Sequence, residues 1–95
     1  MKKSELASAL VDRLPYLTRK DGEILVDTIF ESMVDSLVQG ERIEIRGFGS
    51  FSVRNRAERE GRNPKTGETV HIPARRFPNF KIGKDLYDRI NRTVD

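Results

Sequence analysis

The side chains in this chain that could do chemistry are mostly cationic, and they gather in one stretch. Residues 54–76 carry seven basic side chains against three acidic ones, a net charge of +4. The basic residues are Arg54, Arg56, Arg59, Arg62, Lys65, Arg75 and Arg76. Guanidinium groups bridge phosphate oxygens through paired hydrogen bonds, and strand alternation would put Arg54 and Arg56 on one face. The pattern predicts a surface for a polyanion, most commonly nucleic acid, against the simpler alternative of a solvated basic face.

Catalysis has little support in the same sequence. There is one histidine, His71, no cysteine, and no set of carboxylates that the spacing would bring together. Gly61 and Gly67 are separated by five residues and followed by Glu68, whereas a phosphate loop needs four residues between its glycines and a lysine directly after them. We therefore predict that the chain is not an enzyme and uses no metal or cofactor. His71 is interpreted as a polar surface group.

The centre of the basic stretch is the sequence GRNPKTG at residues 61–67. Pro64 has a rigid apolar ring and no amide hydrogen, Asn63 holds it at the extremity, and Arg62 and Lys65 flank it. A proline in this place could wedge between the base pairs of a duplex. The alternative is that Pro64 and Gly67 are ordinary turn residues.

Helices are predicted at the start of the chain. Apolar residues at helical spacing predict one helix over 3–14. A second helix is expected to begin after Thr18, with Asp21 completing a capping box, and to stop at Gly40. Gly22 in its first turn lowers the helix propensity there. The apolar stripe of the second helix is too wide for the short first helix to cover.

Beyond the helices the apolar period changes to two. This predicts strands over 42–46 and 50–53, joined by a tight turn, and a returning strand that ends near residue 81. Between them, residues 54–76 offer no face that could be buried, so we expect a protruding ribbon arm over approximately that range. A final helix is expected to open at Gly83 and Lys84.

Together these elements predict one α+β domain over residues 1–95. It would have a helical base of two N-terminal helices, a three-stranded antiparallel sheet with a long protruding β-ribbon arm, and a short C-terminal helix. A chain of 95 residues is marginally stable alone, which favours a partner on the uncovered helical stripe.

The net charge of +3 is divided unevenly along the chain. Residues 1–45 carry 6 basic and 9 acidic groups, and residues 46–95 carry 12 basic and 6 acidic groups. The second half is therefore expected to face the polyanion and the first half water. No stretch approaches transmembrane length, charges interrupt any signal-like start, and cysteine is absent, so a cytoplasmic protein without a membrane partner is predicted.

Three separate motifs match a known family. The sequences IRGFGSF at 45–51, GRNPKTG at 61–67 and FKIGK at 80–84 resemble the HU and integration host factor family of bacterial histone-like DNA-binding proteins. The resemblance covers nearly the whole chain, and the three motifs occur in the same order as in the family. It implies an intertwined dimer whose two arms reach around duplex DNA along the minor groove and whose tip prolines intercalate, here Pro64.

The resemblance also implies a function and a set of sites. The function is that of an architectural protein that bends DNA and condenses it in the bacterial nucleoid, supporting recombination, replication, and regulation of transcription and translation. The residues expected to contact DNA are Lys3, Glu44, Arg46, Arg54, Arg56, Arg59, Arg62, Asn63, Pro64, Lys65, Arg75, Arg76, Lys81, Gly83 and Lys84. Those expected in the dimer core are Phe30, Met33, Leu37, Phe48, Phe51 and Phe80.

Within the family, Glu44 and Arg46 resemble the beta subunit of integration host factor, where HU chains usually carry neutral residues. Arg46 and Arg62 would contact the groove, and Glu44 would position Arg46 or meet a base edge. This branch implies a heterodimer with an alpha-type chain. Residues 72–76 look as much like HU, so a non-specific homodimer that compacts DNA stays open.

A rival interpretation comes from another class of protein. The basic arm could wrap an acidic protein while the helical base dimerises, or it could bind single-stranded RNA. Few aromatic residues lie on the arm, which argues against stacking on single-stranded bases.

Overall fold

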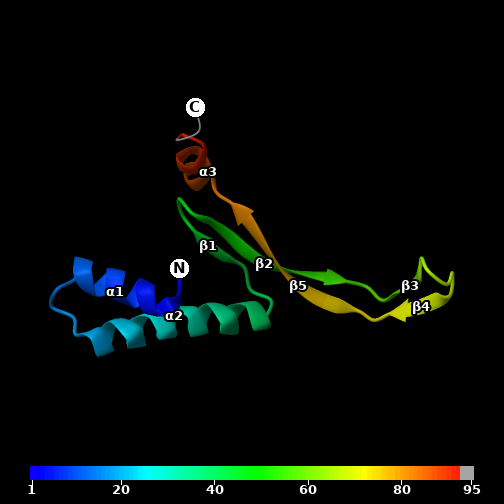
Figure 1. The fold of residues 1–95 in the computed structure, drawn as a ribbon, viewed down its shortest axis with the longest axis horizontal. Helices are drawn as coiled ribbons and strands as arrows, with labels where there is room; N and C mark the ends of the chain where they lie inside the picture. The colour runs from blue at the N-terminus through cyan, green and yellow to red at the C-terminus, as the bar shows by residue number, and fades with distance from the viewer. Residues whose placement is uncertain (93–95) are drawn as a thin grey trace.

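The computed structural model describes residues 1–92 and contains three helices and five strands. The elements are α1 (Lys3–Arg13), α2 (Arg19–Val38), β1 (Ile43–Ile45), β2 (Gly49–Arg56), β3 (Arg59–Arg62), β4 (Thr69–Ile72), β5 (Arg75–Ile82) and α3 (Lys84–Asn91). The two N-terminal helices lie side by side, the sheet stands beside them, and β3 and β4 lie far from the helices (Figure 1). The predicted α+β fold is confirmed.

The first two helices form an antiparallel hairpin with a well-defined start to α2. The Thr18 hydroxyl accepts from the amide of Asp21 at 3.1 Å, and the Asp21 carboxylate accepts from the amide of Thr18 at 3.0 Å. This reciprocal capping box satisfies two amides that helix geometry leaves unpaired, as predicted. Gly40, with φ of 80°, lies just beyond the end of α2 and reverses the chain there.

Gly22 is a packing residue, which the sequence interpretation missed. It is buried where α2 crosses α1. A β-carbon on Gly22 would lie 2.7 Å from Cγ2 of Val11 and 3.2 Å from the carbonyl oxygen of Ala7. The helix tolerates glycine in its first turn because any side chain would push the two helices apart.

Replacing Gly22 by alanine should therefore destabilise the protein. The clash with a stiff β-branched side chain and a backbone oxygen is expected to cost about 1–3 kcal/mol, less the ~0.5–1 kcal/mol that alanine contributes to helix propensity. Thermal unfolding followed by circular dichroism measures the difference. Lys20→Ala, on the exposed side of the same turn, is the control, and equal melting temperatures for the two variants would contradict the close crossing.

The sheet has the strand order β1-β2-β5 and is antiparallel throughout. β1 and β2 are joined by a tight turn in which Phe48 donates its amide to the carbonyl of Ile45 at 3.0 Å and Gly47 has φ of 84°. On the side that faces the helices, the rings of Phe48, Phe51 and Phe80 form a cluster with centroids 4.8–6.3 Å apart. These three rings are the aromatic cluster that the sequence predicts, although Phe48 and Phe80 stay about 43% exposed.

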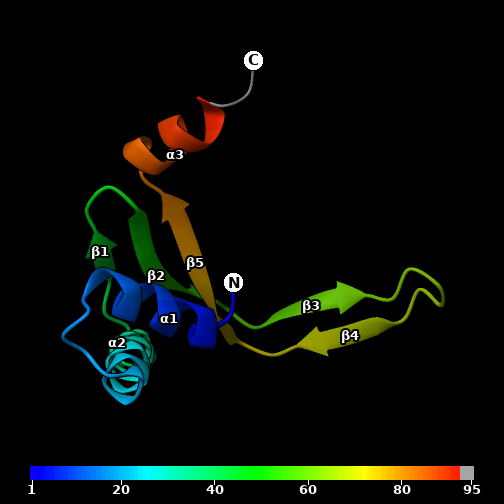
Figure 2. The same cartoon turned by 60° about the vertical axis from the view of Figure 1, so that its left-hand side comes forward.

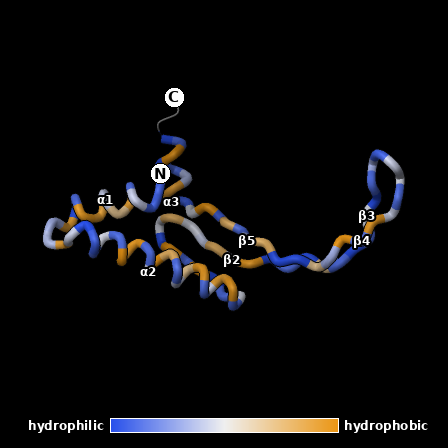
Figure 3. The backbone as a smooth tube through the Cα atoms, turned by 60° about the horizontal axis from the view of Figure 1, so that its bottom comes forward, coloured by the Kyte–Doolittle hydropathy of each residue, from blue (hydrophilic) through white to orange (hydrophobic). Residues whose placement is uncertain are grey.

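The chain buries very little of its apolar surface. Among residues 1–92 the only buried hydrophobic side chains are Ala7 and Val26. Apolar residues recur along α2 and the inner strands (Figure 3), and α2 leaves Ile29, Val34 and Val38 more than half exposed. An apolar concavity of about 680 Å³ opens between α1, α2 and the sheet. The prediction that α1 alone cannot cover the stripe on α2 is confirmed.

The arm over 54–76 is long and protrudes, and its strand pairing is interrupted once. The ladder of β2 and β5 runs outward as far as the pair Arg56 and Arg75, and a separate two-stranded ladder of β3 and β4 follows. Residues 57–58 and 73–74 interrupt the pairing, because Pro73 has no amide hydrogen to donate. Figure 2 shows the outer ladder extending away from the body, and the molecule reaches 61 Å along its longest axis.

The last helix, α3, stands apart from α1 and α2 (Figure 1). Gly83 is its N-cap, as predicted, and Tyr87 and Ile90 stay 55% and 54% exposed. Within residues 1–92, no helix combines the length and the apolar character needed to cross a membrane.

Candidate nucleic-acid interface

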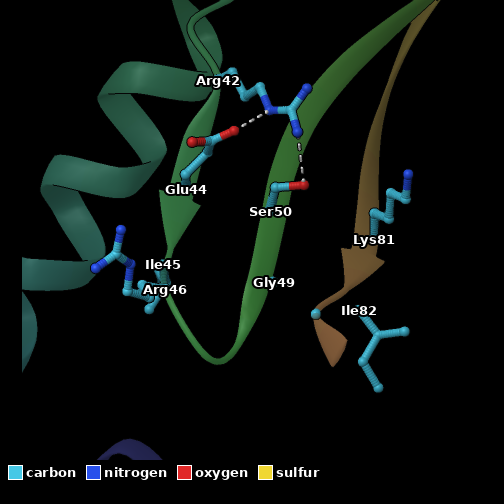
Figure 4. Close-up of a pocket in the computed structure, with 9 residues that line it drawn as sticks. Arg42, Glu44, Ile45, Arg46, Gly49, Ser50, Lys81 and Ile82 are labelled. Carbon is cyan, nitrogen blue, oxygen red and sulfur yellow. Dashed lines mark hydrogen bonds and ion pairs between the residues drawn. The ribbon is translucent and has the colours of Figure 1, made fainter. Parts of the chain in front are cut away.

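The side of the sheet that faces away from the helices carries a row of polar groups. The register places Glu44 of β1, Ser50 of β2 and Lys81 of β5 opposite one another across the three strands. Arg42 joins this row through a salt bridge from its Nε to Oε1 of Glu44, 3.2 Å long, and a hydrogen bond to the Ser50 hydroxyl at 3.4 Å (Figure 4). Arg42, Glu44 and Lys81 are exposed, so their charges are available to a ligand, and Ser50 is half-buried.

Glu44 does not position Arg46 in this structure, contrary to one of the two roles expected for it. Its partner is Arg42, and the guanidinium of Arg46 lies apart from the pair (Figure 4). Arg42 is a candidate that the sequence analysis missed. The signal was present, since Arg42 directly precedes β1 and residues two apart in an extended segment share a face, here with Glu44.

The same face of the sheet continues from the body onto the arm, with one aromatic residue among its polar ones. Arg54 and Arg56 of β2 pair with Phe77 and Arg75 of β5, so these four residues share the face of Ser50 and Lys81. The guanidinium carbon of Arg56 lies 5.2 Å from the centroid of the Phe77 ring, a cation–π distance. Phe77 thus holds one cation of the face in a defined place.

Replacing Arg56 by alanine should weaken the salt dependence of DNA binding. The logarithm of the binding constant falls as the logarithm of the salt concentration rises. Loss of one phosphate contact is expected to make this negative slope shallower by about 1. A fluorescence titration at several salt concentrations measures it. Arg89→Ala, an exposed arginine of α3, is the control and should leave the slope unchanged. A wild-type slope for Arg56→Ala would place this residue off the DNA backbone.

Arg76 lies on the opposite face of β5 from Arg75. Its Nη2 donates to the backbone carbonyls of Val38 and Leu37 at 3.0 and 3.4 Å. The structure therefore separates Arg76 from the other arm cations with which the sequence analysis grouped it.

The tip of the arm is organised by its own side chains. The Asn63 carboxamide oxygen accepts from the amide of Lys65 at 2.9 Å, and the Asn63 carbonyl accepts from the amide of Gly67 at 2.7 Å. Gly67 has φ of 76°, as a turn glycine requires. Pro64 lies at the exposed apex and Arg62 is exposed beside it. The prediction that Asn63 holds Pro64 at the extremity is confirmed.

Gly61, unlike Gly67, is not a turn residue. It lies within β3 opposite Val70, with extended pairing. A β-carbon on Gly61 would lie 2.6 Å from Cδ1 of Ile72. The glycine makes room for Ile72, and this contact gives the outer ladder the little apolar packing that it has.

The outer part of the arm also carries its three acidic residues, Glu58, Glu60 and Glu68, and the histidine, of which Glu60 and His71 pair in the ladder. His71 lies between two of them, with Nε2 3.6 Å from Glu58 and Nδ1 3.6 Å from Glu60. Its side chain is 57% exposed, which fits the interpretation of a polar surface group. In residues 1–92 we find no group of three or more His, Asp or Glu side chains placed to hold a metal ion.

The predicted cations of the body differ in their surroundings. Lys81 is part of the polar row, whereas Lys3 pairs with Asp27 at 3.0 Å and Lys84 with Asp88 at 2.7 Å. These exposed pairs cost little to open, so both lysines can still reach a phosphate. The amide of Gly83, however, donates to the Phe48 carbonyl at 2.9 Å and is not free to bind one.

Comparison with known proteins identifies the family of this chain. The model of the family described as bacterial DNA-binding protein matches residues 1–91. The chain belongs to this family. It is 57% identical to integration host factor subunit beta of Hahella chejuensis over 99% of this chain and 96% of that one. It is 53% identical to the Methylococcus capsulatus subunit beta over the full length of both.

Solved structures of bacterial DNA-binding proteins share the fold. An Anabaena HU–DNA cocrystal structure superposes with a TM-score of 0.79 and 37% identity, covering 95% of this chain and 97% of that one. A point mutant of HU from Thermotoga maritima gives a TM-score of 0.68 and 31% identity over 95% of this chain and 99% of that one. Membership of the family confirms the predicted resemblance to the HU and integration host factor group. The chain is an architectural DNA-binding protein and not an enzyme.

Proposed function

We propose that this chain is one half of a dimer that bends duplex DNA, with each arm in the minor groove and each Pro64 wedged between base pairs. The observation that carries the proposal is one exposed face of the sheet, which carries Lys81 on the body and Arg54 and Arg56 at the start of an arm that ends in an exposed proline. An isolated two-stranded ribbon is only marginally stable in water, so contacts with DNA would stabilise the arm.

The open concavity supports the dimer. Four of the six residues predicted in the dimer core line it, namely Phe30, Met33, Phe48 and Phe51. Fully burying a large apolar side chain is worth about 1.5–3 kcal/mol. These four are already partly covered, so each would contribute a fraction of that to association. A second chain of the same fold would offer a matching apolar face. An alpha-type partner is the favoured one because the relatives are beta subunits.

Bending follows from the balance of two free energies. Neutralised phosphates release counterions, which favours binding and makes it salt-dependent. Unstacking at a kink costs a few kcal/mol, which is known for minor-groove proteins of this class, and the larger area of protein that wrapped DNA touches offsets this cost. Specificity then comes mostly from sequence-dependent deformability, with Arg46 and Arg62 as groove contacts and Glu44, which is paired with Arg42, at a base edge.

The second candidate function is that of an HU-like homodimer, which compacts DNA with little sequence preference. The likeness to HU structures favours it. The mass of the purified chain in solution separates the two: a stable homodimer that bends DNA supports the HU-like function, and a lone chain that is unstable or inactive supports half of a heterodimer. In either case the site of action would be the nucleoid in the bacterial cytoplasm.

A gel-shift titration tests the proposed function against the rival classes. The assembled protein is titrated with linear, gapped and prebent duplexes and with single-stranded RNA of the same length. Bending predicts the tightest binding to the predistorted duplexes, because part of the deformation cost is already met. Equal affinity for all four would indicate a merely cationic surface and contradict the proposal.

A further inference from the structure

Arg76 lies where the arm leaves the body, on the inner face of the sheet. It pairs with Asn55 of β2, one rung before the last pair of the inner ladder. Since side chains alternate along a strand, Arg76 shares the face of Pro78 and Phe80, which is the side toward the helices. Arg75 next to it occupies the polar face. Two adjacent arginines therefore meet two different environments.

The end of α2 is the environment that Arg76 meets. The Val38 carbonyl accepts from Nη2 of Arg76 at 3.0 Å, and the Leu37 carbonyl accepts from the same nitrogen at 3.4 Å. Nη2 also lies close to Gly40, where a β-carbon would be 3.7 Å away, an ordinary van der Waals distance. The contact joins residues 38 positions apart in the chain.

A cation at this end of α2 would stabilise the helix. Its last turn holds no basic residue, while its last carbonyls carry the partial negative charge of a 20-residue helix. Backbone amides satisfy some of them: Gly40 donates to Leu37 at 3.0 Å and Glu41 donates to Ser36 at 2.9 Å. Arg76 supplies the positive charge from a strand 38 residues away.

We propose that Arg76 is a positioning residue, which ties the root of the arm to the end of α2 and fixes the direction in which the arm leaves the body. It acts through this contact and not through a phosphate. The inference rests on the proposed function, since the direction of the arm matters only if the arm wraps DNA. It assigns different tasks to Arg75 and Arg76.

The test compares Arg76→Met with Arg75→Met, because methionine keeps most of the aliphatic stem and removes the guanidinium. The first readout needs no DNA. The chain has no cysteine, so Ser32→Cys on α2 and Thr66→Cys at the tip give a unique pair for spin labels. Labelled chain is diluted into unlabelled partner, so that each assembly carries one pair, and the label distance is measured by pulsed electron paramagnetic resonance.

The second readout is the salt dependence of DNA binding by the same unlabelled variants. Arg76→Met should broaden or shift the distance distribution and leave the salt slope at the wild-type value. Arg75→Met should leave the distances unchanged and lower the slope by about 1, as the loss of one phosphate contact does. Circular dichroism at the measuring temperature verifies that both variants are folded.

An unchanged distance distribution in Arg76→Met, with a slope lowered as in Arg75→Met, would overturn the inference and return Arg76 to the DNA surface. The two proposals fail separately. Wild-type protein that binds DNA without salt dependence would refute the proposed function, while the distances in the free protein would still report whether Arg76 holds the arm.

Discussion

Replacing Phe30 by aspartate is expected to dissociate the assembly and abolish DNA binding at micromolar concentration. Phe30 is 40% exposed and lines the apolar concavity between the helices and the sheet. In the proposed dimer this concavity is filled, so the variant loses the burial of an aromatic ring and places an unpaired carboxylate in an apolar site. We expect association to weaken by at least about 100-fold, a difference of roughly 2.7 kcal/mol.

Light scattering after size-exclusion chromatography measures this effect, on the chain alone and on the chain mixed with an alpha-type partner. The matched control is Ile24→Asp, which introduces the same charge in the same helix. Ile24 is 53% exposed and lies outside the concavity, so this variant should assemble normally. If Phe30→Asp kept the mass and the DNA affinity of the parent, the concavity would not be an interface.

Replacing Pro64 by alanine should reduce the bend in bound DNA and leave most of the affinity. Pro64 is exposed at the apex of a turn whose hydrogen bonds come from Asn63, so alanine preserves the tip. The apolar wedge is lost, but the cations that release counterions remain. We expect less energy transfer between dyes at the two ends of a short duplex and an affinity within about tenfold of the parent, that is about 1.4 kcal/mol.

Lys65→Ala is the complementary control for this prediction. It removes a charge at the same tip and keeps the proline, so the salt slope should fall by about 1 while the bend persists. A full bend in Pro64→Ala would refute the wedge, and loss of the bend in both variants would point to a collapsed tip.

The local elements were predictable because short-range physics decides them. The capping box of Thr18 and Asp21 and the stop at Gly40 are local backbone chemistry. The exposed arm was predictable because residues 54–76 have no apolar face that could be buried. The interruption of the ladder beside Pro73 was predictable too, because proline has no amide hydrogen to donate.

The tertiary contacts were harder to foresee. Gly22 lowers the helix propensity of its own helix. It is needed only because α1 crosses α2 at this point, with Ala7 and Val11 in contact with it. Charge counting grouped Arg76 with the DNA contacts, yet its alternation with Pro78 and Phe80 already placed it on the inner face. The carbonyls that the Arg76 guanidinium contacts depend on where the end of α2 lies relative to the sheet. Neither the composition nor the strand alternation predicts that position.

The most direct test of the proposal is the end-to-end distance of a short duplex on binding. A duplex of about 35 base pairs, with donor and acceptor dyes at its ends, is titrated with the assembled wild-type protein while binding is followed by anisotropy. The proposal predicts that energy transfer rises in parallel with the bound fraction, because wrapping around two arms brings the ends together. Saturated binding with no change in energy transfer would contradict it.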